Sequence, residues 1–360
     1  MDLDELIEKD RRNEMFGDFL RYAQILLSTG PNEDAAERAR MKNHIRAYRI
    51  LKSAMNAVTT DDLATADSRV LTNAWMSLLS ANTLIGRIPF RRADFNTRTH
   101  KETAPASAGW VGDGYPIPVS KIGLGTTSLE LTKIGGICIF TRESVADASR
   151  ASLDNINRAL LNTVGRYTDV ALLDPAISAV VGKNPASITS GVTPIASTGS
   201  TEAAISANIK ALLQTHVDAG ADLSAVVLAM HPASALHMST LLTAGNVRAF
   251  PNLGVRGGEV FGVPVLTSVG AVASGSPSER IVAAINPEGV QVADNGDIFL
   301  SASPKAAIQM DDAPTNQSAA TATGAQLVSM FQAESVALKF TRPLNFEALD
   351  GAVSYMRVGW

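Results

Sequence analysis

The sequence predicts an α+β fold with a protruding two-stranded loop, one long helix, an α/β block and long closing strands. Three patterns support this prediction. Extended, alternating segments favour strands within residues 94–142, and a sustained helical period of apolar residues follows Thr141. Short helices and short apolar strands then alternate from about 185 to 300. The chain has 360 residues, 46% of them hydrophobic, which is enough to bury a large core in two or three domains.

The first 61 residues form a predicted helical segment with a different composition. Two stretches carry apolar residues at helical spacing, and residues 28–31 break the pattern between them. The second stretch is strongly basic, with Arg38, Arg40, Lys42, Arg46, Arg49 and Lys52. Two interpretations stay open: a solvated helix face, or a surface that contacts nucleic acid or an acidic partner.

Residues 62–142 predict an extended arm followed by a protruding loop. A short helix at about 68–80 precedes the end of the arm, and strands are expected at 95–100 and 128–134 on either side of a turn-rich tip. Near this tip, Trp110 and Tyr115 lie among glycines and prolines. The segment is either an ordinary exposed turn or an aromatic anchor that is buried against a partner.

The longest predicted helix begins after Thr141, which can cap it, and continues to Leu173. The α/β block that follows is expected to contain helices at 201–219 and 232–242 and strands at 225–229, 262–266 and 281–285. Long strands are expected at 298–310 and 326–341, on either side of a polar loop at 311–324.

A search for chemistry identifies no catalytic, cofactor-binding or metal-binding residues, so the chain is not expected to be an enzyme. The glycine-containing run at 123–128 lacks the third glycine and the following helix of a dinucleotide loop. His231 and His237 are six residues apart, whereas helical zinc ligands are spaced by three or four. Cys138 lies in an apolar strand pattern and is expected to be a small buried hydrophobic residue. The adjacent Asp311 and Asp312 lie in a predicted loose loop.

Charge, cysteine content and hydropathy argue against several further classes of protein. The net charge of -4 argues against a surface devoted entirely to nucleic acid. The single cysteine rules out an intrachain disulfide. The charged N-terminus lacks an apolar signal core, and no apolar run approaches the ~18 residues of a membrane span. We therefore expect a soluble protein made in the cytoplasm, with no membrane partner.

Four segments resemble the major capsid proteins of tailed bacteriophages with the Hong Kong 97 fold. They are Trp-Val-Gly-Asp-Gly at 110–114 with Pro-Ile-Pro-Val-Ser at 116–120, Thr-Arg-Glu-Ser-Val at 141–145, the closing strand at 330–339 and the final strand at 352–360. The resemblance covers about 65 to 360, with the segments in the family's order.

The resemblance implies a domain map. Its parts are a helical N-terminal segment at 1–61, an N-terminal arm at 62–93, an extended loop at 94–142, a peripheral domain with a spine helix at 143–184 and 298–343, and an α/β axial domain at 185–297 and 344–360. The N-terminal segment would be either a scaffold-like piece that is removed or a retained part of the subunit.

The resemblance also implies a function. The chain would assemble with itself as pentamers and hexamers into an icosahedral shell that encloses phage DNA, in the virion, after assembly in the host cytoplasm. Scaffold, maturation protease, portal and decoration proteins would be further partners, and double-stranded DNA would contact the inner face without sequence specificity. Two alternatives stay open: an encapsulin-like shell that holds a cargo enzyme, and a soluble hydrolase, which would need a nucleophile and a base that the sequence does not reveal.

One branch of this family joins a loop lysine to a neighbour's asparagine, for which Lys101 and Asn316 are the candidates here. Because no catalytic acid can be placed between them, we expect no covalent cross-links. Denaturing gels of mature particles should show one band near 37.8 kDa, or a smaller one after processing. Ladders that survive boiling and reductant would contradict this expectation.

Overall fold

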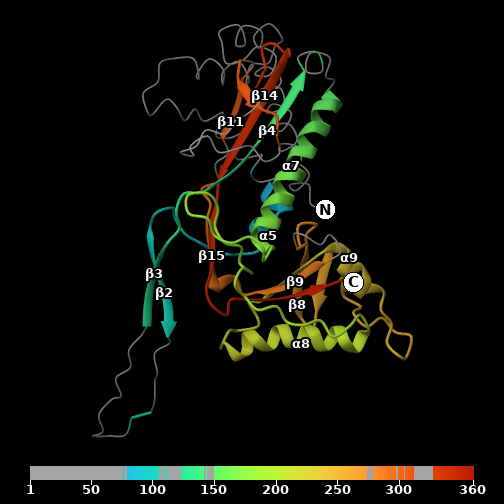
Figure 1. The fold of residues 1–360 in the computed structure, drawn as a ribbon. Helices are drawn as coiled ribbons and strands as arrows, with labels where there is room; N and C mark the ends of the chain where they lie inside the picture. The colour runs from blue at the N-terminus through green and yellow to red at the C-terminus, as the bar shows by residue number, and fades with distance from the viewer. Residues whose placement is uncertain are drawn as a thin grey trace, which may run out of the picture. The chain divides into compact units, whose positions relative to one another are not determined.

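The protein is described from a computed structural model (Figure 1). The structure describes residues 76, 79–104, 110–111, 123–141, 143, 150–273, 279–296, 299–303, 305–311 and 327–360. The predicted segment 1–61 and nearly all of the predicted loop 311–324 lie outside these residues. The chain divides into two units, the first comprising 1–81, 134–164 and 296–342 and the second comprising 82–133, 165–295 and 343–360. The domain map implied by the resemblance is not tested by this division and stays a prediction.

The first unit contains a three-stranded sheet in the order β11 (Phe299–Ser303), β14 (Ser335–Pro343) and β4 (Lys133–Thr141). Strand β11 runs antiparallel to β14, with Phe299 opposite Thr341. Phe340 packs on a small core formed by Met76, Leu79, Leu161 and Val164. A Cβ atom at Gly136 would lie 2.6 Å from the Phe340 ring, so any larger residue there would have to displace that ring.

The two long strands expected in this unit are each interrupted, so their predicted continuity was wrong. Strand β11 is followed by the separate strand β12 (Ala307–Gln309), and β13 (Leu327–Ser329) precedes β14. Residues 330–334 form a turn that ends at Glu334, which has a φ of 45°. The Met330 N–H donates to the Ala306 carbonyl at 2.9 Å and closes the β12–β13 hairpin. The pairing of β12 with β13 therefore separates these two short strands from β11 and β14.

The second unit is centred on a six-stranded sheet in the order β16-β9-β5-β8-β7-β6. Its strands are β5 (Val227–Met230), β6 (Leu253–Gly254), β7 (Gly257–Val260), β8 (Val263–Thr267), β9 (Arg280–Ile285) and β16 (Val353–Val358). Strand β5 is buried along its whole length and lies between β8, which is parallel to it, and β9, which is antiparallel. The predicted strands at 225–229, 262–266 and 281–285 are therefore confirmed within about two residues.

Helices α8 (Glu202–Asp218) and α9 (Pro232–Thr240) belong to the same unit and confirm the two helices predicted there. The Thr201 side chain accepts a hydrogen bond from the Ala204 N–H, and Pro232 occupies the first turn of α9. The apolar face of α8 packs on the sheet through a core that includes Ile205, Ile209, Leu212, Leu228 and Met356.

A smaller sheet of the second unit was not predicted. It consists of β1 (Arg91–Arg92), β10 (Val290–Ala293) and β15 (Asn345–Ala348) in that order. Strand β1 is parallel to β10, and β15 is antiparallel to it. About 200 residues separate β1 from β10 in the sequence, and about 50 separate β10 from β15. A local sequence pattern therefore cannot predict this sheet.

The extended loop contains β2 (Arg98–Ala104) and β3 (Gly123–Ser128), which form an antiparallel pair. The predicted strand boundaries were shifted. Asn96 has a φ of 57° and lies in a turn, so the first strand begins at Arg98. The expected strand at 128–134 is interrupted at 129–132, because the Thr132 carbonyl accepts from the Leu344 N–H at 3.1 Å instead of continuing a hairpin ladder.

The long helix predicted after Thr141 is observed as α7 (Arg150–Leu173), which ends where expected. Thr141 itself is the last residue of β4, and Glu143 is helical. Residues 144–149 lie outside the described part of the chain. The helix contributes residues to both units, since the division falls at Val164 and Gly165.

A buried carboxylate near the end of α7 holds three elements of the second unit together. Asp169 accepts from the Leu84 N–H at 2.8 Å and from the Ser268 hydroxyl at 2.5 Å. Leu84 is the first residue of the short helix α5 (Leu84–Arg87), whose N-cap Thr83 makes no side-chain capping bond. Asp169 therefore caps α5 from 85 residues away and ties it to the residue that follows β8.

Replacing this carboxylate should destabilise the subunit strongly. Asp169→Ala leaves the buried Leu84 N–H without this acceptor, and we expect a loss of about 3 kcal/mol in the free energy of unfolding. Asp169→Asn keeps one acceptor oxygen and should cost about 1 kcal/mol. Asp218→Ala removes an exposed carboxylate that accepts a hydrogen bond from the Gln214 side chain at 2.8 Å; it serves as the control and should be nearly neutral. Urea unfolding of the unassembled subunit measures all three; equal stability of Asp169→Ala and the control would contradict the capping role.

Candidate assembly surfaces

The β2–β3 hairpin forms a two-stranded sheet that includes no third strand among the described residues. Pairing runs from Arg98 opposite Ser128 to Ala104 opposite Gly123, with an irregularity between Glu102 and Ala104. Both outer edges of the sheet are therefore without a strand partner in the described part of the subunit. Such edges favour association with another chain.

Beyond the paired strands, the hairpin presents apolar side chains to solvent. Trp110 is fully exposed, and Val111 is 40% exposed. An exposed tryptophan places a large apolar area in water, and burial against a partner would remove it. Tyr115, the second aromatic residue of the proposed anchor, lies outside the described residues.

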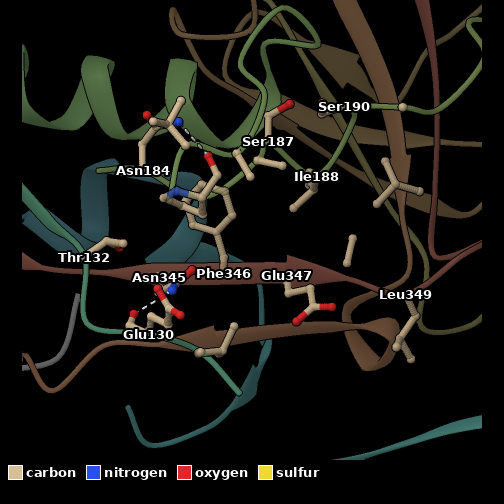
Figure 2. A pocket seen from close by; sticks show the side chains of 18 of the residues that line it. Glu130, Thr132, Asn184, Ser187, Ile188, Ser190, Asn345, Phe346, Glu347 and Leu349 are labelled. Atoms are coloured by element: carbon tan, nitrogen blue, oxygen red, sulfur yellow. Dashed lines mark hydrogen bonds between the residues drawn. The ribbon is translucent and has the colours of Figure 1, made fainter. Parts of the chain in front are cut away.

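A groove lies at the base of the hairpin, with a cavity volume of about 690 Å³ (Figure 2). Its lining comes from three segments of the second unit: residues 128–132, residues 179–192 and residues 345–353. Figure 2 shows Asn184, Ser187 and Ile188 on one wall and β15 on the other, with Phe346 directed from β15 toward the first wall. Residues far apart in sequence thus form one concave surface.

The first wall of the groove is fixed by hydrogen bonds to the end of α7. The Ile188 N–H donates to the Leu172 carbonyl at 2.9 Å, and the Thr189 hydroxyl donates to the Leu173 carbonyl at 2.6 Å. The Asn184 side-chain amide donates to the carbonyls of Ser178 and Pro185 at 2.9 and 3.0 Å. These bonds pre-form the wall, so a ligand would lose little entropy in ordering it.

The opposite wall is joined to the hairpin base. The Asn345 side-chain amide donates to the Glu130 carbonyl at 2.6 Å, and the Thr132 hydroxyl donates to the Leu344 carbonyl. Acidic side chains line the groove at Glu130, Glu347 and Asp350, and the lining contains no lysine or arginine. The groove is therefore lined by apolar and uncharged polar side chains together with three acidic ones.

The residues considered for chemistry are not brought together. The run 123–128 is strand β3 and not a loop before a helix, so it cannot bind a dinucleotide in the usual way. Cys138 is half-buried in β4, and burial raises the pKa of its thiol. His231 caps α9 by accepting from the Ala233 N–H at 3.1 Å, and the His237 ring lies 5.8 Å from that of Trp360.

Across the described part of the chain, no three histidine, cysteine or acidic residues are grouped so as to hold a metal ion. In the same residues, no helix combines the length and the apolar character that crossing a bilayer requires. The concave and exposed surfaces described above are thus the features to which a function can be assigned.

Of His216, His231 and His237, only His216 is fully buried, on the sheet-facing side of α8. Its Nε2 lies 3.1 Å from the Ala284 carbonyl and 3.2 Å from the Ser354 hydroxyl. Because Ala284 offers only an acceptor, Nε2 carries the proton and Nδ1 is unprotonated, with no hydrogen-bond partner. Burial lowers the pKa of His216, and its hydrogen bond to Ala284 opposes this only in part.

Comparison with known proteins gives one curated relative. No family model matches the chain. The capsid polyprotein of Pseudomonas phage PAJU2 is 30% identical over 326 residues, an alignment that covers 86% of this chain and 48% of that protein. The chain thus spans about half the length of this relative.

Solved structures from three phages share the fold. The structure from Gordonia phage Cozz has a TM-score of 0.56 at 15% identity and covers 77% of this chain and 86% of its own. The structures from Microbacterium phage Oxtober96 and Mycobacterium phage Cain have TM-scores of 0.55 and 0.53 at 16% identity, cover 77% and 78% of this chain, and are themselves covered over 90% and 89% of their lengths. These similarities confirm the predicted fold class.

The buried imidazole predicts how the stability of the subunit depends on pH. Since folding lowers the pKa of His216, the stabilisation is fully present above about pH 6.5 and is lost as the pH falls toward the folded pKa. His216→Gln keeps a donor for Ala284 and removes the titration, so its unfolding free energy should fall less steeply between pH 7 and pH 5. Gln214→Ala on the same helix is the control and should retain the wild-type slope. Identical slopes in wild type and His216→Gln would show that this group does not titrate on unfolding.

Proposed function

We propose that the chain is a major capsid protein of a tailed bacteriophage with the Hong Kong 97 fold, because it is 30% identical to a phage capsid polyprotein and shares its fold with solved phage structures. Its copies assemble as pentamers and hexamers into an icosahedral shell that encloses double-stranded DNA. The structural observation that supports this most directly is the β2–β3 hairpin, which has no third strand among the described residues, together with the fully exposed Trp110. A subunit that functioned alone would gain nothing from this exposed area.

The domain map belongs to the same proposal. Residues 62–93 are the arm, 94–142 the extended loop, 143–184 with 298–343 the peripheral domain, and 185–297 with 344–360 the axial domain. Scaffold, protease, portal and decoration proteins are the further partners, and assembly takes place in the host cytoplasm. The basic residues between Arg38 and Lys52 contact DNA at the inner face if residues 1–61 stay with the subunit.

An assembled shell is stabilised by many weak and repeated contacts. Each subunit is held by several neighbours, so modest affinities at single contacts combine into a stable particle. At about 25 cal/mol per Å², a largely buried aromatic side chain contributes roughly 2 to 3 kcal/mol per contact. Trp110 would supply such a contact once in every subunit.

An encapsulin-like shell with a cargo enzyme is the alternative, and the phage capsid polyprotein among the relatives favours the viral shell. The contents of purified particles distinguish the two: nucleic acid is expected, and protein cargo without DNA would identify the alternative. Expressed alone or with a scaffold, the chain should sediment as capsomers or shells. A protein that stays monomeric under all conditions would contradict the proposal.

Trp110→Ala should separate assembly from folding. Since Trp110 is fully exposed within its own subunit, the variant should keep the circular dichroism and the melting temperature of the wild type. Particle yield should fall strongly, because the apolar contact with a neighbour is lost. Phe331→Ala, at another exposed aromatic residue outside the hairpin, is the control. A Trp110→Ala subunit with a clearly lowered melting temperature would refute the anchor role.

A further inference from the structure

One edge of the six-stranded sheet brings the ends of the parallel strands β5 and β8 next to the start of β9. Met230 ends β5 and Thr267 ends β8, and the Ser268 N–H donates to the Met230 carbonyl at 3.0 Å. Val282 of β9 pairs with Met230, so Arg280 lies just beyond the end of β5. Ligands of open α/β sheets bind most often beside the carboxyl ends of parallel strands, so this edge is a favourable position for a site.

Three basic side chains from three different elements meet at this edge. His231 precedes α9, Arg280 is the first residue of β9, and Arg166 belongs to α7. The loop after β8 joins these elements, since Val272 forms a β-bridge with Arg280. A Cβ atom at Gly270 would lie 2.9 Å from the Arg166 carbonyl oxygen, so the same loop touches α7. Burial lowers the pKa of His231, and the positive charges of Arg280 and Arg166 lower it further, which shows that both charges lie near the ring.

The acidic residues around these cations are bonded to other groups. The Asp169 carboxylate binds α5 and the loop after β8, as described above. Glu279 forms an ion pair with Arg357 at 3.5 Å. Neither Arg166 nor Arg280 forms an ion pair with an acidic residue in the part of the chain that the structure describes. The two guanidinium groups therefore repel each other there without an anion between them.

The imidazole beside them is held as a hydrogen-bond donor. His231 Nδ1 accepts from the Ala233 N–H at 3.1 Å, so the neutral ring carries its proton on Nε2. Arg166 is exposed, and Arg280 and His231 are partly exposed, so a ligand can reach all three side chains. Together they offer one imidazole N–H and two guanidinium groups.

We propose that Arg166, Arg280 and His231 bind a phosphate group. A phosphate carries up to two negative charges and more acceptor oxygens than a carboxylate, so it can bond three donors that arrive from three elements. Guanidinium groups bind phosphate through paired hydrogen bonds, which are strengthened by the opposite charges. The phosphate belongs either to a nucleic-acid backbone or to a free phosphate ion. The inference does not depend on the proposed function, since a single subunit contains all three residues.

Titration of inorganic phosphate into the full-length chain tests the site. At about pH 7 and constant ionic strength, phosphate should raise the melting temperature of the wild type, because a ligand bound by the folded state stabilises it. Arg166→Gln and Arg280→Gln should each weaken phosphate binding about tenfold, since each removes a charge-assisted hydrogen bond. Arg248→Gln, at an exposed arginine in the loop after α9, is the matched control and should change binding by less than about twofold.

His231→Asn tests the imidazole separately from the helix cap. Asparagine is a good N-cap residue, so the variant keeps an acceptor for the Ala233 N–H and should retain the wild-type melting temperature in the absence of phosphate. It loses the Nε2 donor, and its phosphate binding should be weaker than that of the wild type. Phosphate binding of wild-type strength in His231→Asn would remove the imidazole from the site.

Two further probes identify the chemistry and the source of the group. Acetate at the same ionic strength should raise the melting temperature less than phosphate does, and an equal or larger shift would overturn the assignment to phosphate. A DNA duplex of about 20 base pairs distinguishes the sources: equal weakening of duplex binding in the two arginine variants assigns the site to nucleic-acid phosphate, and unchanged duplex binding assigns it to the free ion. Absence of a phosphate effect on the wild type, or full phosphate binding by both arginine variants, would overturn the site.

Discussion

The second unit depends on one buried carboxylate. Asp169 is 1% exposed and binds both the first N–H of α5 and the hydroxyl of Ser268. Helix α5 has four residues and is too short to be stable by itself, so its place is set by this long-range cap. A Cβ atom at Gly270 would lie 2.6 Å from the Asp169 Cβ, so the close approach of this loop to α7 requires glycine. The end of the arm, α7 and the loop after β8 therefore form one connected arrangement.

The elements that the sequence predicts well are those whose signals are local. Helix α8 starts after the capping Thr201, helix α9 starts at Pro232, and β5 and β9 are short apolar runs that are buried throughout or nearly so. Helix caps, prolines and hydrophobic runs determine structure within a few residues, so they can be recognised in a single sequence. The end of α7 at Leu173 is of the same kind, since Asp174 and Pro175 follow it.

What the sequence does not predict depends on distant partners. Strands β6 and β7 are two and four residues long, and Gly257 and Gly258 adopt positive φ where a side chain would collide with backbone carbonyls. The small sheet joins β1, β10 and β15 across the length of the chain. The groove has the same origin, because its three lining segments become neighbours only after folding. The exposed Trp110, by contrast, was recognisable as an isolated aromatic residue among glycines.

A shell subunit has to satisfy two opposing demands. It needs a core that folds before assembly, which the buried sheet of the second unit supplies, and it needs apolar surface left uncovered for its neighbours. If the hairpin folded back and buried Trp110 on its own chain, the monomer would gain stability and lose a contact that is repeated throughout a shell. Holding the tip on a two-stranded sheet with no further strand partner among the described residues keeps that area available. In this arrangement the apolar area left exposed in the free subunit becomes the driving force for assembly.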